Sequence, residues 1–111
     1  MPDSPIDVAV FAELRQTAGE DFVVELVETF LDEAPQMLRD MRSALAGADA
    51  ASLRRAAHSL KSNANTFGAT ALGAMAREIE LGGLPADASP LDALQTEYVR
   101  VAAALKRACN D

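Results

Sequence analysis

The sequence predicts an all-α protein, an antiparallel four-helix bundle with a short extra helix at its N-terminus. Ala, Leu, Glu and Arg dominate the 111 residues while β-branched residues are sparse, and this composition favours helix over sheet. Apolar residues recur at helical spacing along four long segments. Short connections join these segments, so consecutive helices are expected to pack antiparallel.

The chain is predicted to start with a flexible tail over residues 1–5, which hold two prolines and little apolar content. A single helical domain is expected over residues 6–108. Its short extra helix is predicted from about Asp7 to Thr17, and Gly19 ends it.

The long segment from about Glu20 to Ala46 carries core-facing apolar residues throughout and is predicted to be one helix. Pro35 lies inside this segment. Because proline lacks a backbone N–H, one helical hydrogen bond must be missing there, and we expect a bend or a break.

Asp49 is a good N-cap for the next helix, which runs to Phe67. Gly68 suits the left-handed position that follows a helix. A further helix is predicted from about Thr70 to Leu81, and Gly82-Gly83 stops it.

The last helix is predicted to begin at Ser89-Pro90, with the serine as N-cap and the proline at the first helical position. Its core-facing stripe consists of Leu91, Leu94, Tyr98, Val101 and Leu105. Nothing along the chain indicates a second domain or a repeat.

The formal net charge of −7 argues against partners that are themselves strongly anionic. Nucleic acids and anionic membrane surfaces both need a cationic footprint on the protein. Acidic residues are nevertheless absent from Ala50 to Ala76, where Arg54, Arg55 and Lys61 lie, and Arg77 follows directly. This stretch is either a solvated face with chance charge placement or a docking face for an acidic partner or a phosphoryl group.

The chain is expected to be cytoplasmic. Its single cysteine, Cys109, cannot form an internal disulfide, which suits a reducing compartment. The N-terminus lacks the features of a signal peptide, and no apolar run approaches the ~20 residues needed to span a bilayer.

His58 is the only histidine of the chain. Apolar residues around it have helical spacing, at Leu53, Ala56, Ala57, Leu60, Ala64 and Phe67. At about 100° per residue these positions form one stripe, and His58 falls roughly 150° from its centre. Its neighbours are polar: Arg54, Lys61, Ser62 and Asn65. We therefore predict that His58 faces water.

Motifs of enzymes and metal sites are missing from the sequence, among them a glycine-rich phosphate loop, a nucleophile elbow and paired metal-binding cysteines. One histidine cannot build a zinc or di-iron centre without several inward carboxylates, and ligation of haem would need His58 to point into the bundle. No metal or cofactor is therefore expected in the chain itself.

An exposed imidazole on a rigid helix can act as a nucleophile, because histidine is in general largely neutral at about pH 7. Lys61 lies one turn after His58 and Arg54 one turn before it, close enough to stabilise an anion placed on the ring. Phosphoryl transfer depends mainly on positioning and charge stabilisation, and these residues match that requirement.

The string Ala57-His58-Ser59-Leu60-Lys61-Ser62, followed by Gly68-Ala69, resembles the signature of the histidine-containing phosphotransfer (HPt) domains of phosphorelays. In that family the pattern reads His-x-Leu-Lys-Gly, with a glycine-alanine pair a few residues on. The resemblance covers roughly residues 6–107 and includes the segments 30–35, 53–57 and 76–80.

The resemblance implies that His58 is phosphorylated and that Lys61 stabilises the phosphoryl group. Glu80 occupies the position where the family often has Gln or Glu hydrogen-bonding the imidazole, although an ordinary solvated acid at a helix end is the alternative. Ser62 replaces the usual glycine, so we expect slower or more selective transfer.

The implied function is a monomeric phosphoryl carrier between receiver domains of response regulators or hybrid kinases. Without an ATP site it should not phosphorylate itself, so it is not expected to be an enzyme, and Mg²⁺ is expected only in the partner receiver. The partner is expected to contact Arg54, Arg55, Asn65 and Arg77. Two alternatives remain: a helical adaptor that accepts no phosphate, and the isolated donor domain of a chemotaxis-type kinase.

Overall fold

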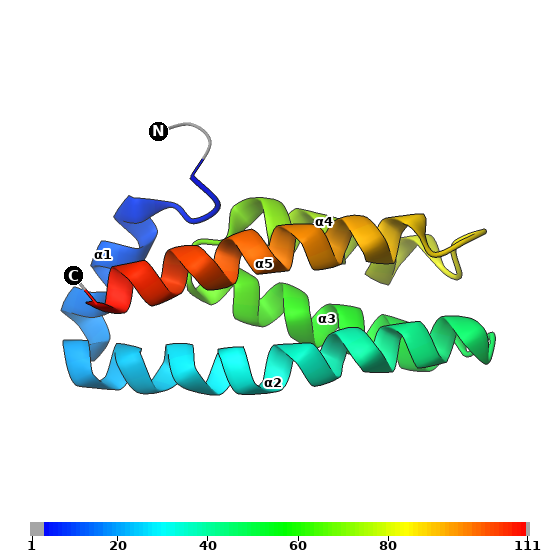
Figure 1. The fold of residues 1–111 in the computed structure, drawn as a ribbon, viewed down its shortest axis with the longest axis horizontal. Helices are drawn as coiled ribbons and strands as arrows, with labels where there is room; N and C mark the ends of the chain where they lie inside the picture. The colour runs from blue at the N-terminus through cyan, green and yellow to red at the C-terminus, as the bar shows by residue number, and fades with distance from the viewer. Residues whose placement is uncertain (1–3, 111) are drawn as a thin grey trace.

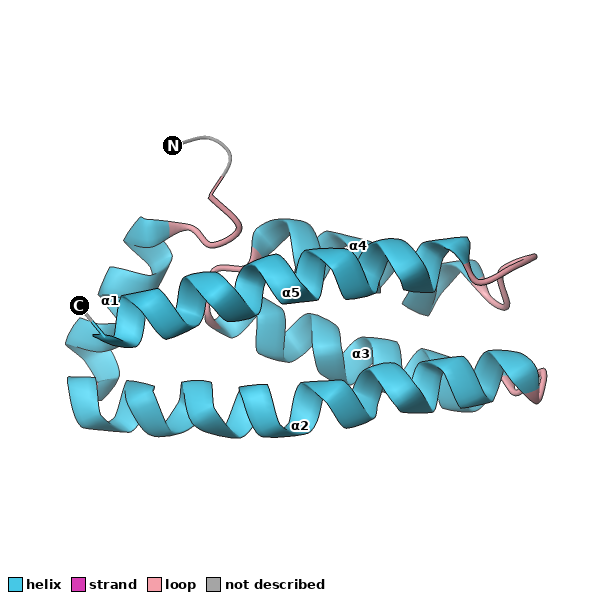
Figure 2. Ribbon diagram, in the orientation of Figure 1, coloured by secondary structure: helices cyan, strands magenta, loops and turns pink. Residues whose placement is uncertain are grey.

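The computed structural model describes residues 4–110, which form five helices and no strand (Figures 1 and 2). The helices are α1 (Val8–Ala18), α2 (Glu20–Ala46), α3 (Ala50–Thr66), α4 (Thr70–Gly82) and α5 (Ser89–Asn110). The predicted fold class, four long helices and a short N-terminal one, is confirmed. Of the predicted N-terminal tail, residues 1–3 lie outside the described residues, and the Ser4 hydroxyl donates to the Ile6 carbonyl at 2.8 Å.

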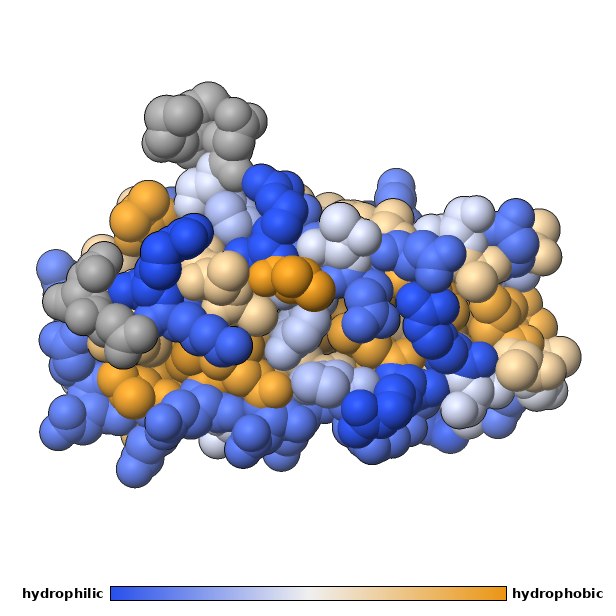
Figure 3. Space-filling view, viewed as in Figure 1, coloured by the Kyte–Doolittle hydropathy of each residue, from blue (hydrophilic) through white to orange (hydrophobic). Residues whose placement is uncertain are grey.

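The bundle is elongated, with a longest dimension of 41 Å. This is the length expected of the 27-residue α2, about 40 Å at 1.5 Å per residue. In Figure 1, α2 and α5 run along the front of the bundle and the α3–α4 hairpin lies behind them. Hydrophobic residues show mainly along the seam between α2 and α5, while hydrophilic residues cover the outer edge of α2 (Figure 3).

Helix α2 continues through Pro35 without interruption, so the predicted alternative of a break is wrong. The residues around the proline explain this, because Ala34 and Leu38 are buried at 0% and 5% exposure. Packing of an amphipathic face stabilises a helix more than one missing backbone hydrogen bond destabilises it.

An aromatic cluster joins three parts of the bundle. The ring of Phe30 in α2 lies 5.4 Å from Phe67, which follows α3, and 5.9 Å from Tyr98 in α5, centroid to centroid. The Tyr98 contact is edge-to-face, a favourable arrangement for aromatic pairs. The predicted stripe of α3 is also buried, at Leu53, Ala57, Leu60 and Ala64. This burial fixes the rotation of α3 about its own axis.

Both predicted ends of α3 are confirmed. Asp49 caps the helix, since its side chain accepts a hydrogen bond from the Ser52 amide at 3.1 Å. At the other end, Gly68 follows the C-cap Phe67 with a φ of +78°, in the left-handed region. The Gly68 carbonyl also accepts from the Asp7 amide at 2.7 Å, which ties the start of α1 to the α3–α4 turn.

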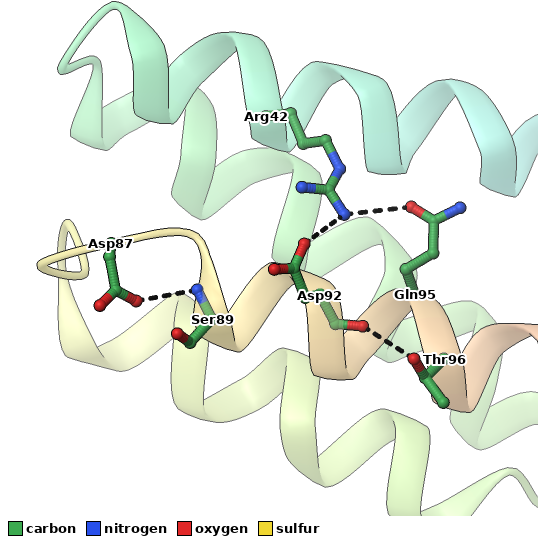
Figure 4. A network of polar contacts seen from close by, with 6 residues as sticks. All are labelled: Arg42, Asp87, Ser89, Asp92, Gln95 and Thr96. Atoms are coloured by element: carbon green, nitrogen blue, oxygen red, sulfur yellow. Dashed lines mark hydrogen bonds and ion pairs between the residues drawn. The ribbon is translucent and has the colours of Figure 1, made fainter.

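The start of α5 differs by one residue from the prediction. Ser89 is the first helical residue and not the N-cap, so Pro90 occupies the second position. The Ser89 amide donates to the Asp87 side chain at 2.8 Å, so Asp87 provides the cap (Figure 4). The capping side chain is thus that of Asp87 and not that of Ser89, because the Asp87 carboxylate reaches the free amide at the start of the helix.

Two arginines hold helices of the bundle together. Arg42 of α2 contacts α5 through the Asp92 carboxylate at 3.0 Å and the Gln95 amide oxygen at 3.4 Å (Figure 4). Arg15 of α1 donates to the Ala108 carbonyl near the end of α5. These contacts connect elements that are far apart in the sequence.

Candidate functional site

The candidate site lies on the α3–α4 hairpin, where the buried stripe of α3 turns His58 outward. The His58 side chain is 58% exposed, so the prediction that it faces water is confirmed. It lies on the side of α3 that meets α4, and this brings residues of both helices to the imidazole.

Glu80 of α4 contacts His58 and Lys61 at the same time. Its Oε2 lies 2.8 Å from His58 Nδ1, and its Oε1 lies 2.7 Å from Lys61 Nζ. The Glu80 side chain is only 13% exposed. The alternative that Glu80 is an ordinary solvated acid at a helix end is therefore wrong. Its carboxylate lies between His58 and Lys61 and contacts both.

The Lys61 ammonium and, second, the His58 ring hold the pKa of Glu80 below its ordinary value of 4.5. Glu80 is therefore ionised at neutral pH and can only accept hydrogen bonds. It follows that His58 Nδ1 carries the proton and donates it to Glu80 Oε2. In the neutral imidazole Nε2 then keeps its lone pair, which makes Nε2 the nucleophilic atom.

Lys61 is less accessible than an ordinary surface lysine, with a side chain 23% exposed. Its ammonium is directed to Glu80, one turn along α3 from His58. The structure thus brings together three of the predicted site residues, His58, Lys61 and Glu80.

The other predicted residues do not contact His58 in any interaction that the structure describes. Arg54, Ser62 and Arg77 are exposed, and Arg55 is exposed with its guanidinium donating to the Ser52 hydroxyl at 3.1 Å. Asn65 is exposed but its amide oxygen lies against Gly73 of α4, so this side chain is directed to the neighbouring helix.

One feature beside His58 was missed by the sequence analysis. A groove of about 610 Å³ runs between α2 and α3, lined by Met37, Asp40, Arg55 and Ser59 among others. The residues predicted to contact the partner lie on α3 and α4, and none of them is on α2. The sequence did contain a sign of this groove on α2. Asp40 and Ser43 follow Met37 at successive intervals of three residues, so the three lie along one side of the helix.

Within residues 4–110, no three histidine, cysteine or acidic side chains lie together in a cluster that could hold a metal ion. In the same part of the chain, no helix has the length and hydrophobicity needed to cross a bilayer.

The family model of the Hpt domain matches residues 25–104. The chain belongs to the Hpt domain family. Among solved structures, it is similar to the crystal structure of histidine-containing phosphotransfer protein B (HptB) from Pseudomonas aeruginosa PAO1. The two are 25% identical and superpose with a TM-score of 0.85, over 97% of this chain and 96% of the other. The comparison with curated proteins gave no match.

Hpt domains are phosphoryl carriers, not kinases, and they interact with receiver domains in phosphorelays. The predicted function is therefore confirmed: the chain is a histidine phosphotransfer protein of a phosphorelay. The alternative of an adaptor that accepts no phosphate is not favoured.

Proposed function

We propose that Nε2 of His58 accepts the phosphoryl group from an aspartyl phosphate of a receiver domain and passes it to the aspartate of another. The observation that carries this proposal is the 2.8 Å contact between His58 Nδ1 and Glu80. It holds the ring in one orientation and keeps the proton on Nδ1, so that the lone pair of Nε2 remains for the reaction.

In the transfer, the Nε2 lone pair forms a bond to phosphorus while the bond from phosphorus to the aspartyl oxygen breaks. The electron pair of the broken bond stays on the departing carboxylate. Because Nδ1 keeps its proton, the ring becomes positively charged, and the ionised Glu80 beside it stabilises that charge. The return transfer to a second aspartate reverses these steps.

Lys61 has the position and charge to stabilise the phosphoryl oxygens. It is one turn from His58, and its ammonium is held on the same side of α3 by Glu80. Ser62, exposed and four residues after His58, leaves room for the partner to approach. Arg54, Arg55 and Arg77 supply a cationic margin that suits the acidic rim of a receiver's Mg²⁺ pocket.

We also place the protein in the cytoplasm, as a monomer with no ATP site and no cofactor of its own. The Mg²⁺ that the reaction needs is bound by the partner receiver, beside its aspartate. The groove between α2 and α3 extends the docking surface beside His58.

The test is transfer from a ³²P-labelled receiver to the wild-type protein and to His58→Gln. Wild type should take up label that is lost in acid and kept in alkali, as expected for phosphohistidine, while His58→Gln takes up none. The variant should remain folded, within about 0.5 kcal/mol of wild type, because the replaced side chain is exposed. Label on folded His58→Gln, or acid-stable label on wild type, contradicts the proposal.

A further inference from the structure

A second contact between α3 and α4 lies on the same seam as the candidate site. Asn65 follows His58 by seven residues on α3, and Gly73 precedes Glu80 by seven residues on α4. Seven residues are about two helical turns, so the pair Asn65–Gly73 lies in register with the pair His58–Glu80 in this antiparallel hairpin. It lies between the site and the turn that joins the helices.

Gly73 has no room for a side chain in this position. A Cβ atom added to it would lie 2.2 Å from Oδ1 and 3.0 Å from Cγ of Asn65. Gly73 is buried, and the amide of Asn65 occupies the space beside its Cα. The Asn65 side chain therefore fills the space that a side chain at residue 73 would need.

The position of the Asn65–Gly73 contact near the α3–α4 turn means that a small displacement there becomes a larger one at Glu80. The α3–α4 turn is short, residues 67–69, and Ala69 N donates back to Ala64 O at 2.9 Å, so the hairpin is fixed at that end. Gly73 lies four residues beyond the turn and Glu80 eleven. If a wedge at Gly73 tilts α4 away from α3, the displacement at Glu80 is roughly two- to threefold larger.

A small separation at Glu80 matters because both of its contacts depend on close approach. They measure 2.8 Å to His58 and 2.7 Å to Lys61. A side-chain contact longer than about 3.5 Å no longer counts as a hydrogen bond. A tilt that moves Glu80 by about 1 Å would therefore release the imidazole.

We infer that Gly73 is a positioning residue for the phosphotransfer reaction, because the missing side chain there leaves room for the Asn65 amide at the α3–α4 spacing at which Glu80 orients the His58 ring. Neither Gly73 nor Asn65 touches the reacting atoms. The kinetic part of this inference rests on the proposed function, whereas its structural part concerns only the tautomer of His58.

The experiment compares wild type, Gly73→Ala, Asn65→Ala and the double variant. Gly82→Ala is the matched control, since it adds the same methyl group to the same helix where nothing lies within 4 Å. Alanine has a higher helix propensity than glycine, so both substitutions should stabilise α4 by this effect alone. A loss of stability or of the wild-type tautomer in Gly73→Ala therefore comes from the contact with Asn65. The first readout is the ¹⁵N spectrum of the imidazole at about pH 8, where histidine is in general neutral and its tautomers are distinguishable.

We expect a dominant Nδ1–H tautomer in wild type and Gly82→Ala, and a mixture of both tautomers in Gly73→Ala. The double variant should regain the wild-type tautomer, because removal of the Asn65 amide makes room for the added methyl group. Phosphotransfer should be roughly ten- to a hundredfold slower in Gly73→Ala than in wild type. It should return in the double variant to the rate of Asn65→Ala alone.

A Gly73→Ala protein with the tautomer and transfer rate of wild type would overturn the inference, since Asn65 would then simply have rotated away. A tautomer change without rescue in the double variant would overturn it too. Failure of the proposed function is distinguishable: wild type itself would then accept no phosphate, whatever the imidazole spectra show.

Discussion

The Lys61 ammonium lies 2.7 Å from Oε1 of Glu80, and the other oxygen of that carboxylate lies 2.8 Å from the His58 ring. Without a phosphoryl group, the cation is thus neutralised by a neighbour on α4. A phosphoryl group on Nε2 would add a second anion within reach of the same ammonium. Lys61 would then be shared between Glu80 and the phosphoryl oxygens.

Replacing Lys61 by Ala should slow phosphoryl transfer and shorten the lifetime of the phosphorylated form. The loss removes a charge-assisted contact, which is worth about 1.5–3 kcal/mol when partly desolvated and less where water screens it. Rapid-quench transfer from a labelled receiver measures the rate, and decay of the label measures the lifetime. Lys106→Ala on α5 is the matched control. If Lys61→Ala behaves like this control at every salt concentration, Lys61 has no role in the chemistry.

Glu80→Gln should alter the dependence of stability on pH. The partners of Glu80 hold its pKa below the ordinary value of 4.5, so its ionised form favours the folded state. This contribution is fully present above the ordinary pKa and is lost as pH falls through the lowered one. The difference in unfolding free energy between wild type and Glu80→Gln should therefore be constant near neutral pH and shrink below about pH 4.5.

Urea unfolding from neutral to acidic pH measures this difference, with Glu78→Gln, an exposed acid on the same helix, as the control. A difference for Glu80→Gln that is unchanged throughout the acid range would show that its partners do not favour the ionised form.

Reversing Arg54 and Arg55 to Glu should slow association with an acidic receiver by about tenfold at low salt, because steering charges act mainly on the rate of encounter. The salt dependence of association should weaken as well. Stopped-flow binding at several ionic strengths measures both effects. Lys106→Glu with Arg107→Glu gives the same change of net charge on α5, and equal effects of the two double variants would indicate a general charge effect and no local docking.

Ser62→Tyr should leave the rate of association with the receiver nearly unchanged and block phosphoryl transfer after binding. Ser62 is exposed and lies one turn from His58, so a bulky ring there would prevent the close approach of an aspartate. Single-turnover transfer at saturating receiver separates the chemical step from binding. Normal transfer by Ser62→Tyr would place the docking face elsewhere.

Gly68→Ala should destabilise the fold by about 1–3 kcal/mol, the usual cost of a left-handed conformation in a residue with a side chain. Its φ is +78°, and an added Cβ would lie 3.0 Å from both Asp7 O and Val10 Cβ. Urea denaturation measures the loss, with Gly82→Ala as the control. A Gly68→Ala protein as stable as the control would show that the α3–α4 turn relaxes without cost.

Hydrophobic spacing was sufficient to predict the bundle, because each long helix buries one continuous apolar stripe. The stripe through Leu53, Leu60 and Ala64 also predicted that His58 faces outward, since the burial of one face fixes the opposite one. Pro35 was harder to interpret from sequence. Its effect depends on how strongly its neighbours are packed, and that is a tertiary property.

The shared carboxylate of Glu80 could not be derived from spacing alone. The resemblance to a family suggested its contact with the imidazole, but the pairing with Lys61 depends on how α4 is rotated against α3. The direction of Asn65 has the same origin, since only the packed hairpin shows that its amide fills the space beside Gly73. The cap of α5 was assigned to Ser89 because local preference cannot decide between two neighbouring cap residues, Asp87 and Ser89.

The nucleophile, its orienting carboxylate and the nearby cation all belong to one continuous hairpin, α3 and α4. Helices α2 and α5 supply the packing beneath that hairpin, and α2 also forms one wall of the groove beside it. On the proposed docking surface, sequence change along the α2 wall of this groove would alter partner recognition while His58, Lys61 and Glu80 keep their contacts. Part of the partner preference can thus change on a helix that carries neither the reactive histidine nor the residues that contact it.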